Sequence, residues 1–188
     1  LGLEYKKNKL NDINNFFEAK IATVYRDKNE KFIPRSSGIG SKDSNIFGSI
    51  SSNQFNFIDI SYDFILDNDF KTLEYNSLNT SINYKNFKTS FNFIEEDGAI
   101  GDTNTIENKT SVKFNDENYL TFNTRRNRKI DLTEYYNLVY EYKNDCLIAG
   151  IKYNKSYYED RDLKPSENLL FSITLTPLTS FEQKIDQW

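Results

Sequence analysis

The chain has 188 residues, a formal net charge of −4, one cysteine and no histidine. The absence of histidine excludes Ser-His-Asp and Cys-His nucleophiles, histidine general bases and histidine-containing zinc sites, and one thiol forms no internal disulfide. Basic residues are scattered rather than clustered, which argues against nucleic-acid binding. We therefore expect no enzyme, no metal site, no cofactor and no nucleic-acid partner.

Hydrophobic residues make up 37% of the chain and the mean hydropathy is −0.72, yet 15 phenylalanines and 13 tyrosines are too many for a disordered chain. No apolar run approaches the roughly 18 residues of a transmembrane helix. Apolar residues at every second position would reconcile these values. The chain lacks methionine and begins at Leu1 within a polar–apolar pattern, so we expect a piece of a longer protein.

Period-2 alternation recurs along the chain and predicts β-strands. In "IDISYDFIL", residues 58–66, apolar side chains occupy every even position, and in "LLFSITLT", residues 169–176, every odd one. The sequence predicts about ten antiparallel strands and no helix. They lie near 17–26, 43–52, 54–66, 71–84, 87–95, 105–114, 118–126, 130–143, 146–157 and 167–176, with residues 1–7 as the end of one more.

The connections between these strands differ in length. Three are long and polar, at 27–42, 96–104 and 158–166, and counting strands puts all three on one side of the sheet. Outer-membrane barrels sort their loops in this way, with short turns in the periplasm and longer loops outside. The predicted fold is all-β, a portion of an antiparallel transmembrane β-barrel with about ten up-and-down strands. By itself this piece is expected to form either an open curved sheet or a small closed barrel.

In such a barrel one face of each strand meets lipid and the other a polar lumen. Lys or Arg near the midplane of the lipid face costs about 2–4 kcal/mol, and the apolar faces of 58–66 and 169–175 carry no charge. By their face, Asp59, Asp63, Asn79 and Asn83 are candidate lumen residues. A large soluble β-sandwich, with the aromatic residues in its core, is an alternative interpretation.

The last long connection holds three carboxylates, Glu159, Asp160 and Asp162, beside Arg161 and Lys164. Paired carboxylates are one route to acid–base catalysis without histidine. Because basic residues are interleaved with them, we interpret this cluster as a solvated, salt-bridged loop.

Several motifs combine in order and spacing. Tyr140, Tyr142, Asp145 and Cys146 form "Y-x-Y-x-x-D-C", which is followed by "DRDLKP" at 160–165 and "LLFSITLTPL" at 169–178. Upstream are "VYRD" at 24–27, "PRSSGIGSKDSNIFGSI" at 34–50 and "YDFILD" at 62–67. This set resembles the barrel of the LptD family of lipopolysaccharide-assembly proteins, with the specific likeness confined to 24–66 and 135–178. The resemblance implies C-terminal barrel strands in 1–178 and a tail in 179–188.

The resemblance implies transport rather than catalysis. LptD-type barrels insert lipopolysaccharide into the outer leaflet of the Gram-negative outer membrane, releasing it sideways between their first and last strands. The implied partners are lipopolysaccharide, an LptE-type lipoprotein plug, outer-membrane lipid, and periplasmic Lpt bridge proteins that bind an N-terminal domain outside this sequence. The implied location is the cell outer membrane, with the C-terminus in the periplasm.

Two site predictions follow from the resemblance. Cys146 would start a strand on the periplasmic side, an oxidising compartment, and is a candidate for a disulfide to the periplasmic domain, although the alternative is a small packed hydrophobe. The family often carries two adjacent cysteines here, whereas this chain has Asp145 before Cys146. The second site is a lateral-gate strand at 167–176, ended by Pro177, with the residues Leu169, Leu170, Phe171, Ser172, Ile173, Thr174 and Leu175.

Three other classes stay open. A general outer-membrane porin or receptor fits the strand pattern, but it has no need for a periplasmic disulfide. A barrel enzyme is disfavoured by the absence of histidine. A soluble β-sandwich binding module is disfavoured by the one-sided sorting of the loops.

Overall fold

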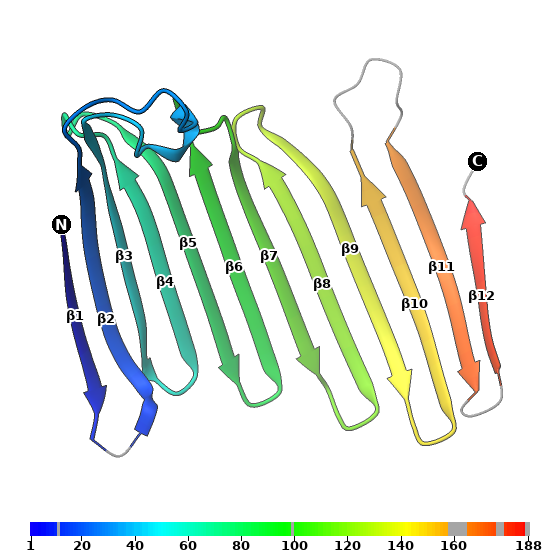
Figure 1. The fold of residues 1–188 in the computed structure, drawn as a ribbon. Coiled ribbons are helices and arrows are strands. Elements are labelled where there is room, and N and C mark those ends of the chain that lie inside the picture. The colour runs from blue at the N-terminus through cyan, green and yellow to red at the C-terminus, as the bar shows by residue number, and fades with distance from the viewer. Residues whose placement is uncertain (11, 99, 158–164, 176–178, 187–188) are drawn as a thin grey trace. The chain divides into compact units, whose positions relative to one another are not determined.

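The structure, a computed structural model, describes the chain except residues 11, 99, 158–164, 176–178 and 187–188. The described part contains twelve β-strands and one short 3₁₀ helix, η1 (Figure 1). The elements are β1 (Gly2–Lys9), β2 (Asp12–Tyr25), η1 (Arg35–Ser37), β3 (Asp43–Phe55), β4 (Ile58–Leu66), β5 (Leu73–Tyr84), β6 (Phe87–Glu96), β7 (Asn104–Lys113), β8 (Asn118–Asn127), β9 (Leu132–Lys143), β10 (Leu147–Ser156), β11 (Ser166–Leu175) and β12 (Thr179–Asp186).

The strands form one sheet whose spatial order follows the chain from β1 to β12. Neighbouring strands pair antiparallel, as β2 does with β3 and β10 does with both β9 and β11. The predicted all-β class and up-and-down antiparallel topology are therefore confirmed. The order is linear rather than closed into a ring, as expected for an open sheet.

The main differences between the predicted elements and the structure are four, and the first is that β2 begins at Asp12 rather than near residue 17. The segment expected as a tail contains β12, which pairs along β11 from Leu175↔Thr179 to Asn168↔Asp186. The turn between β3 and β4 lies at 56–57, so the strand predicted to begin at 54 begins at Ile58. Residues 35–37 form η1 where no helix was predicted. Alternation is weak in the β12 segment and absent from residues 35–37, whereas "QFNF" at 54–57 alternates although the turn lies within it.

The chain divides into two compact units. The first comprises Leu1–Ile82 and Phe91–Thr105, and the second Asn83–Ser90 and Ile106–Trp188. Within the first unit the longer connections 26–42, 67–72 and 97–103 contrast with the turns at 10–11 and 56–57. Asp97 N donates to Glu74 O at 2.8 Å, which brings the second and third of these longer connections to the same end.

The second unit has the same sorting of its connections. At one end lie the turns 85–86, 114–117 and 144–146, linked by Lys113 N to Asn86 O and by Lys143 N to Glu117 O, both at 2.8 Å. The connection 128–131 lies at the other end, where β10 also ends at Ser156 and β11 begins at Ser166. The longest connection of this unit is thus on the opposite side from its short turns, as predicted.

The molecule has no hydrophobic core among its described residues. Every described side chain that is buried is polar: Asn15, Ser44, Asn76, Ser77, Thr89 and Thr105. The large apolar side chains stay partly or largely exposed, so the sheet is held by its backbone ladder and cross-strand contacts. In the described part of the chain, no helix combines the length and apolar character needed to cross a membrane.

Candidate functional site

The first unit carries one face of exposed apolar side chains. Strand register places one large aliphatic residue from each of β1 to β5 on this face. These residues are Leu3, Ile21, Ile50, Ile60 and Leu78, with 39–69% of their surface exposed. The opposite face bears Glu18 with Lys6 at 3.3 Å and with Lys20 at 3.2 Å. The two faces therefore differ sharply in polarity, which defines the apolar face and the polar face of this unit.

The second unit has an apolar face of the same kind. Leu138, Ile151, Phe171, Ile173 and Leu175 share it and are 39–47% exposed. Tyrosines flank this band along β9. An ion pair on this face joins Lys155 Nζ to Glu167 Oε2 at 3.2 Å, near the long-connection end of β10 and β11. Charge is thus kept away from the middle of the band.

The predicted lumen residues Asp59, Asp63 and Asn79 all lie on the polar face of the first unit. Asp59 Oδ2 accepts a hydrogen bond from Ser81 Oγ at 3.3 Å, and Asn79 Nδ2 donates to Ser77 Oγ at 3.3 Å. The fourth, Asn83, follows on the same strand at the start of the second unit. The register thus places Asp59, Asp63 and Asn79 on one face. The contact of all four residues with a lumen stays a prediction.

On the polar face of the second unit, asparagines align across four strands. The register pairs Asn123 with Asn137, Asn137 with Asn154, and Asn154 with Asn168. Neighbouring strands lie about 4.8 Å apart, so the four carboxamides form one row across the sheet. The sequence pattern alone does not predict this row, because the row depends on the register between strands.

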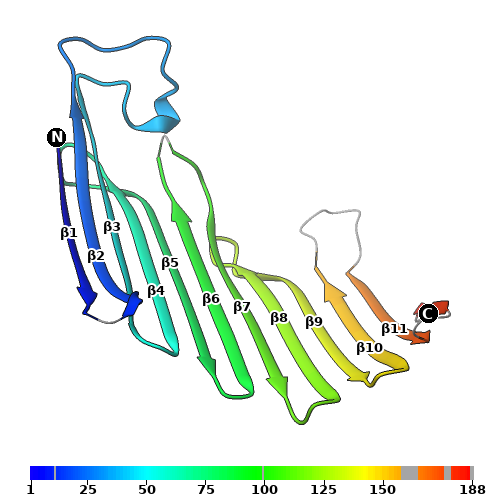
Figure 2. The same ribbon diagram turned by 60° about the horizontal axis from the view of Figure 1, so that its bottom comes forward.

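The 26–42 segment forms a pocket with the strand ends of the first unit. Gly38 O accepts from Asn45 N at 3.0 Å, and Arg26 Nε donates to Ile39 O at 3.1 Å. Asn45 Nδ2 also donates to the Glu74 carboxylate. These contacts border a hollow of about 540 Å³ with a mixed polar and apolar lining that includes Lys31 and Ile33. Figure 2 shows the segment, with η1, arching beyond the strands.

The predicted gate residues lie in β11 and divide between two faces. Leu169, Phe171, Ile173 and Leu175 point to the apolar face, whereas Ser172 and Thr174 point to the polar face together with Leu170. The strand pairs with β10 on one side and with β12 on the other. The expectation that 167–176 is the outermost strand therefore needs correction, because β12 occupies that position.

Cys146 lies in the turn between β9 and β10 and is exposed, with a free thiol. Its backbone N donates to Asn144 Oδ1 at 3.0 Å, so the turn is closed by the asparagine side chain. The alternative of a packed hydrophobe does not fit this exposure. The carboxylates Glu159, Asp160 and Asp162, most of "DRDLKP", and Pro177 lie outside the described residues.

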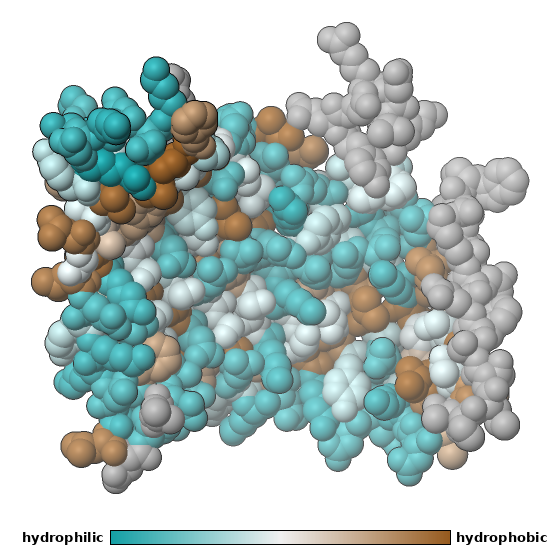
Figure 3. Space-filling view, viewed as in Figure 1, coloured by the Kyte–Doolittle hydropathy of each residue, from teal (hydrophilic) through white to brown (hydrophobic). Residues whose placement is uncertain are grey.

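Among the described residues, no group of three or more His, Cys, Asp or Glu side chains has the arrangement of a metal site. In the space-filling view of Figure 3, the face turned to the viewer is largely hydrophilic.

Comparison of the chain with protein-family models, with curated proteins and with solved structures found no match.

Proposed function

We propose that this chain is a membrane-embedded β-sheet of the bacterial outer membrane, with its apolar faces against lipid. The observation that carries the proposal is the absence of any buried hydrophobic side chain in the described part, together with exposed aliphatic rows on one face of each unit. Soluble monomers rarely expose contiguous apolar patches larger than a few hundred Å². Each square ångström removed from water contributes about 25 cal/mol, so lipid would stabilise this surface substantially.

Three further features support lipid as the material that covers the apolar faces of the two units. Strands of 10 residues, such as β8, β10 and β11, suit a tilted crossing of the hydrocarbon layer. The connections in each unit are sorted into a short-turn end and a long-connection end. Aromatic residues flank the aliphatic band, as in interfacial girdles. A protein partner would require none of these three features.

The proposed biological role is lipopolysaccharide transport to the outer leaflet, as part of an LptD-type barrel. The motifs around Cys146 and in β11 support this role, and the polar faces supply a surface compatible with a saccharide. The proposal includes a lateral gate at the edge of the sheet formed by β11 and β12, and a disulfide from Cys146 to a periplasmic domain. A porin or receptor barrel is the alternative that keeps the membrane position.

Adjacent residues on opposite faces provide the test of membrane position. In a Trp188→Phe background, Leu138→Trp is expected to be quenched by brominated lipid in bilayers, whereas Asn137→Trp is not. Equal quenching of both tryptophans, or of neither, rejects the proposed membrane position. The two substituted positions are neighbours in β9, so a difference in quenching cannot come from a difference in membrane depth or in the distance to the nearest turn.

Transport needs a separate experiment. In a bacterium that depends on the full protein, depletion is expected to lower lipopolysaccharide at the cell surface, measured by antibody labelling of intact cells. On non-reducing gels, a mobility shift lost in Cys146→Ser would tie the barrel to a periplasmic domain. Undiminished surface lipopolysaccharide would reject transport and, with lipid quenching retained, favour the porin or receptor alternative.

A further inference from the structure

Positive charge gathers in a groove on the polar face of the second unit, although the whole chain is negatively charged. Lys85, Lys88 and Lys113 line this groove, which has a volume of about 570 Å³ at the short-turn end of the unit. Glu141 is the one carboxylate among its described lining residues. The three ammonium groups face Glu141 and Asp116, which pairs with Lys113, so one positive charge remains in excess. We call it the lysine groove.

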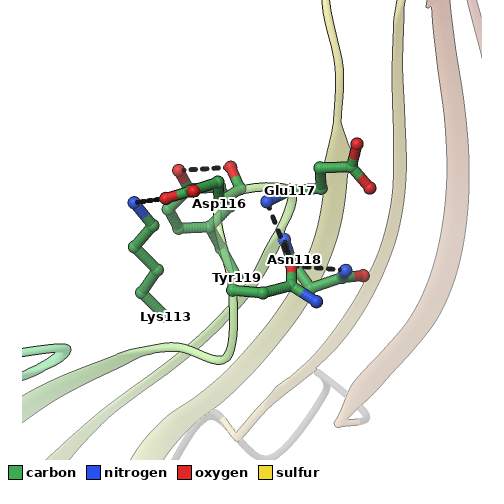
Figure 4. A network of polar contacts seen from close by, with 6 residues as sticks. Lys113, Asp116, Glu117, Asn118 and Tyr119 are labelled. Carbon is green, nitrogen blue, oxygen red and sulfur yellow. Dashed lines mark hydrogen bonds and ion pairs between the residues drawn. The ribbon is translucent and has the colours of Figure 1, made fainter.

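The turn 114–117 positions one of these ammonium groups (Figure 4). Asn115 Oδ1 accepts from Glu117 N at 3.0 Å and from Asn118 N at 2.9 Å, which closes the turn. Asp116 Oδ1 then holds Lys113 Nζ at 2.7 Å. Lys113 Nζ also lies 5.7 Å from the ring centroid of Tyr119, within cation–π range. Lys113 is therefore oriented before any ligand arrives.

The other two lysines differ from Lys113 in their partners. Lys85 Nζ lies 5.3 Å from the Tyr84 ring centroid and has an aromatic rather than an acidic partner. Among the described residues Lys88 has no ion-pair partner, and neither does Glu141. A free ammonium group and one held only by a ring keep most of their attraction for an added anion. These two lysines are the groups best able to bind one.

Two neutral polar side chains are among the residues that line the groove. Ser111 Oγ and Thr121 Oγ1 lie 3.1 Å apart across β7 and β8. Hydroxyl groups both donate and accept, so this pair can donate to an anionic oxygen while keeping its own hydrogen bond. The side chains of Tyr119 and Val139 contribute apolar surface to the lining of the groove. A phosphate group, with several acceptor oxygens and high charge, matches ammonium donors and hydroxyl groups in this arrangement.

We propose that the lysine groove is a binding site for phosphate-bearing ligands. The shared chemistry is a phosphate group, which either a free phosphate compound or a lipid headgroup would provide. Lys85, Lys88 and Lys113 bind its oxygens, and Glu141 opposes the bound charge. This site does not depend on the proposed membrane position, because its geometry lies entirely within the described polar face of one unit.

The test measures binding to the full protein in detergent micelles by calorimetry. Pyrophosphate is the free probe, and micelles containing phosphatidylglycerol, compared with phosphatidylcholine, are the lipid probe. Lys88→Gln and Lys113→Gln are each expected to weaken binding about tenfold, and Glu141→Gln to tighten it about threefold. Lys71→Gln is the matched control, because Lys71 is an exposed lysine paired with Asp69 at 3.4 Å in another turn.

Opposite effects of the lysine and glutamate variants cannot arise from misfolding alone. The expected pattern with pyrophosphate identifies a site for free phosphate compounds. The same pattern found only with phosphatidylglycerol identifies a lipid headgroup site. Binding of either probe that is unchanged by Lys88→Gln and Glu141→Gln, or no binding of either probe, overturns the proposal. Raised salt is expected to weaken binding by screening.

Discussion

Gly48 and Phe64 are paired across β3 and β4, and the phenylalanine ring covers the glycine. A Cβ atom added to Gly48 would lie 2.1 Å from Phe64 Cζ, far inside contact distance. The absent side chain lets an aromatic ring lie flat on the backbone, an arrangement that compensates a glycine within a strand. Gly48→Val is expected to lower the free energy of unfolding by about 1–3 kcal/mol through overpacking.

Urea unfolding in detergent micelles measures this change. The control is Gly2→Ala, because a Cβ atom at Gly2 would lie 3.5 Å from Ala22 Cβ in ordinary contact. Its stability should match that of the parent chain. If Gly48→Val unfolds at the same urea concentration as the parent, the ring moves away without cost and the pair is not a stabilising contact.

A second prediction concerns the irregular pairing of β2 with β3, where register shifts between Thr23 and Tyr25. Ser44 is 2% exposed. Its Oγ accepts from Val24 N at 2.7 Å and donates to Asn45 O at 2.8 Å, so the hydroxyl replaces a missing ladder bond. Ser44→Ala leaves the Val24 N–H without this acceptor and is expected to cost about 1–3 kcal/mol.

Hydrogen exchange at the Val24 amide is the direct measurement, and it should speed up in Ser44→Ala. Ser51→Ala is the control, since Ser51 is a regularly paired serine of the same strand. Equal protection of Val24 in both variants would show that another group, or water, satisfies the amide.

Period-2 alternation predicted most strands because polarity in this sheet follows the pleat. It assigned Asp59, Asp63 and Asn79 to one face correctly for the same reason. It did not predict the row of Asn123, Asn137, Asn154 and Asn168, because register between strands is set by turns and bulges. The sequence pattern also does not predict that Phe64 covers Gly48, because the two residues are paired across strands and are not neighbours in the sequence.

The lysine groove and the pocket beneath the 26–42 segment were missed for related reasons. Lys88 and Lys113 are 25 positions apart in the chain and belong to different strands. Their convergence requires both the hairpin register and the closed turn at 114–117. The strand β12 was missed because its sequence, "TSFEQKID", alternates only weakly and follows a proline. The sequence pattern thus predicts which residues share the apolar or the polar face. The positions of the lysine groove and of the pocket depend on how the strands pair, which the pattern does not contain.

Gly38 provides a third prediction, on the 26–42 segment. Its φ of +67° lies in the left-handed region, and an added Cβ would lie 2.9 Å from Asn45 Nδ2. Gly38→Ala is expected to cost about 1–2 kcal/mol locally and to loosen the segment from the strand ends. Limited trypsin digestion should then cleave faster at Lys28 and Lys31.

Gly40→Ala is the matched control for this digestion. The nearest atoms to an added Cβ at Gly40 lie 3.4 Å away, on Ile33, and no left-handed φ is involved. Cleavage of Gly40→Ala should follow the parent chain. Identical cleavage rates for the two alanine variants would mean that Gly38 does not hold the segment in place.

The pH response of the 114–117 turn gives a fourth prediction. The hydrogen bond from Lys113 lowers the pKa of the Asp116 carboxyl below its usual value. When the pKa of a carboxyl is lower in the folded protein than in the unfolded chain, the carboxyl stabilises the fold at pH values above its unfolded pKa. This stabilisation is lost as the pH falls through the folded pKa. For an aspartate this window lies below about pH 4. Lys113→Gln should return the pKa to its usual range, as followed by carboxyl-carbon NMR.

The same titration bears on the lysine groove. Because Asp116 holds Lys113 only while ionised, phosphate binding at Lys113 competes with that ion pair. Adding pyrophosphate is expected to raise the pKa of Asp116 in the parent chain. A pKa that does not respond to pyrophosphate, while calorimetry detects binding, would place the anion away from Lys113.

The final prediction tests β12, where sequence and structure differ most. Ser172 and Glu182 are opposed in the pairing of β11 with β12. Directly opposed strand positions have Cβ atoms about 4.5–5.5 Å apart, while diagonal neighbours lie about 7–8 Å apart. In a Cys146→Ser background, Ser172→Cys with Glu182→Cys should therefore oxidise to a disulfide, and Ser172→Cys with Lys184→Cys should oxidise much less. Mass spectrometry of the oxidised protein distinguishes the two pairs. Equal yields would mean that 179–186 samples many positions as a tail, which would return β11 to the outermost place and with it the original location of the proposed gate.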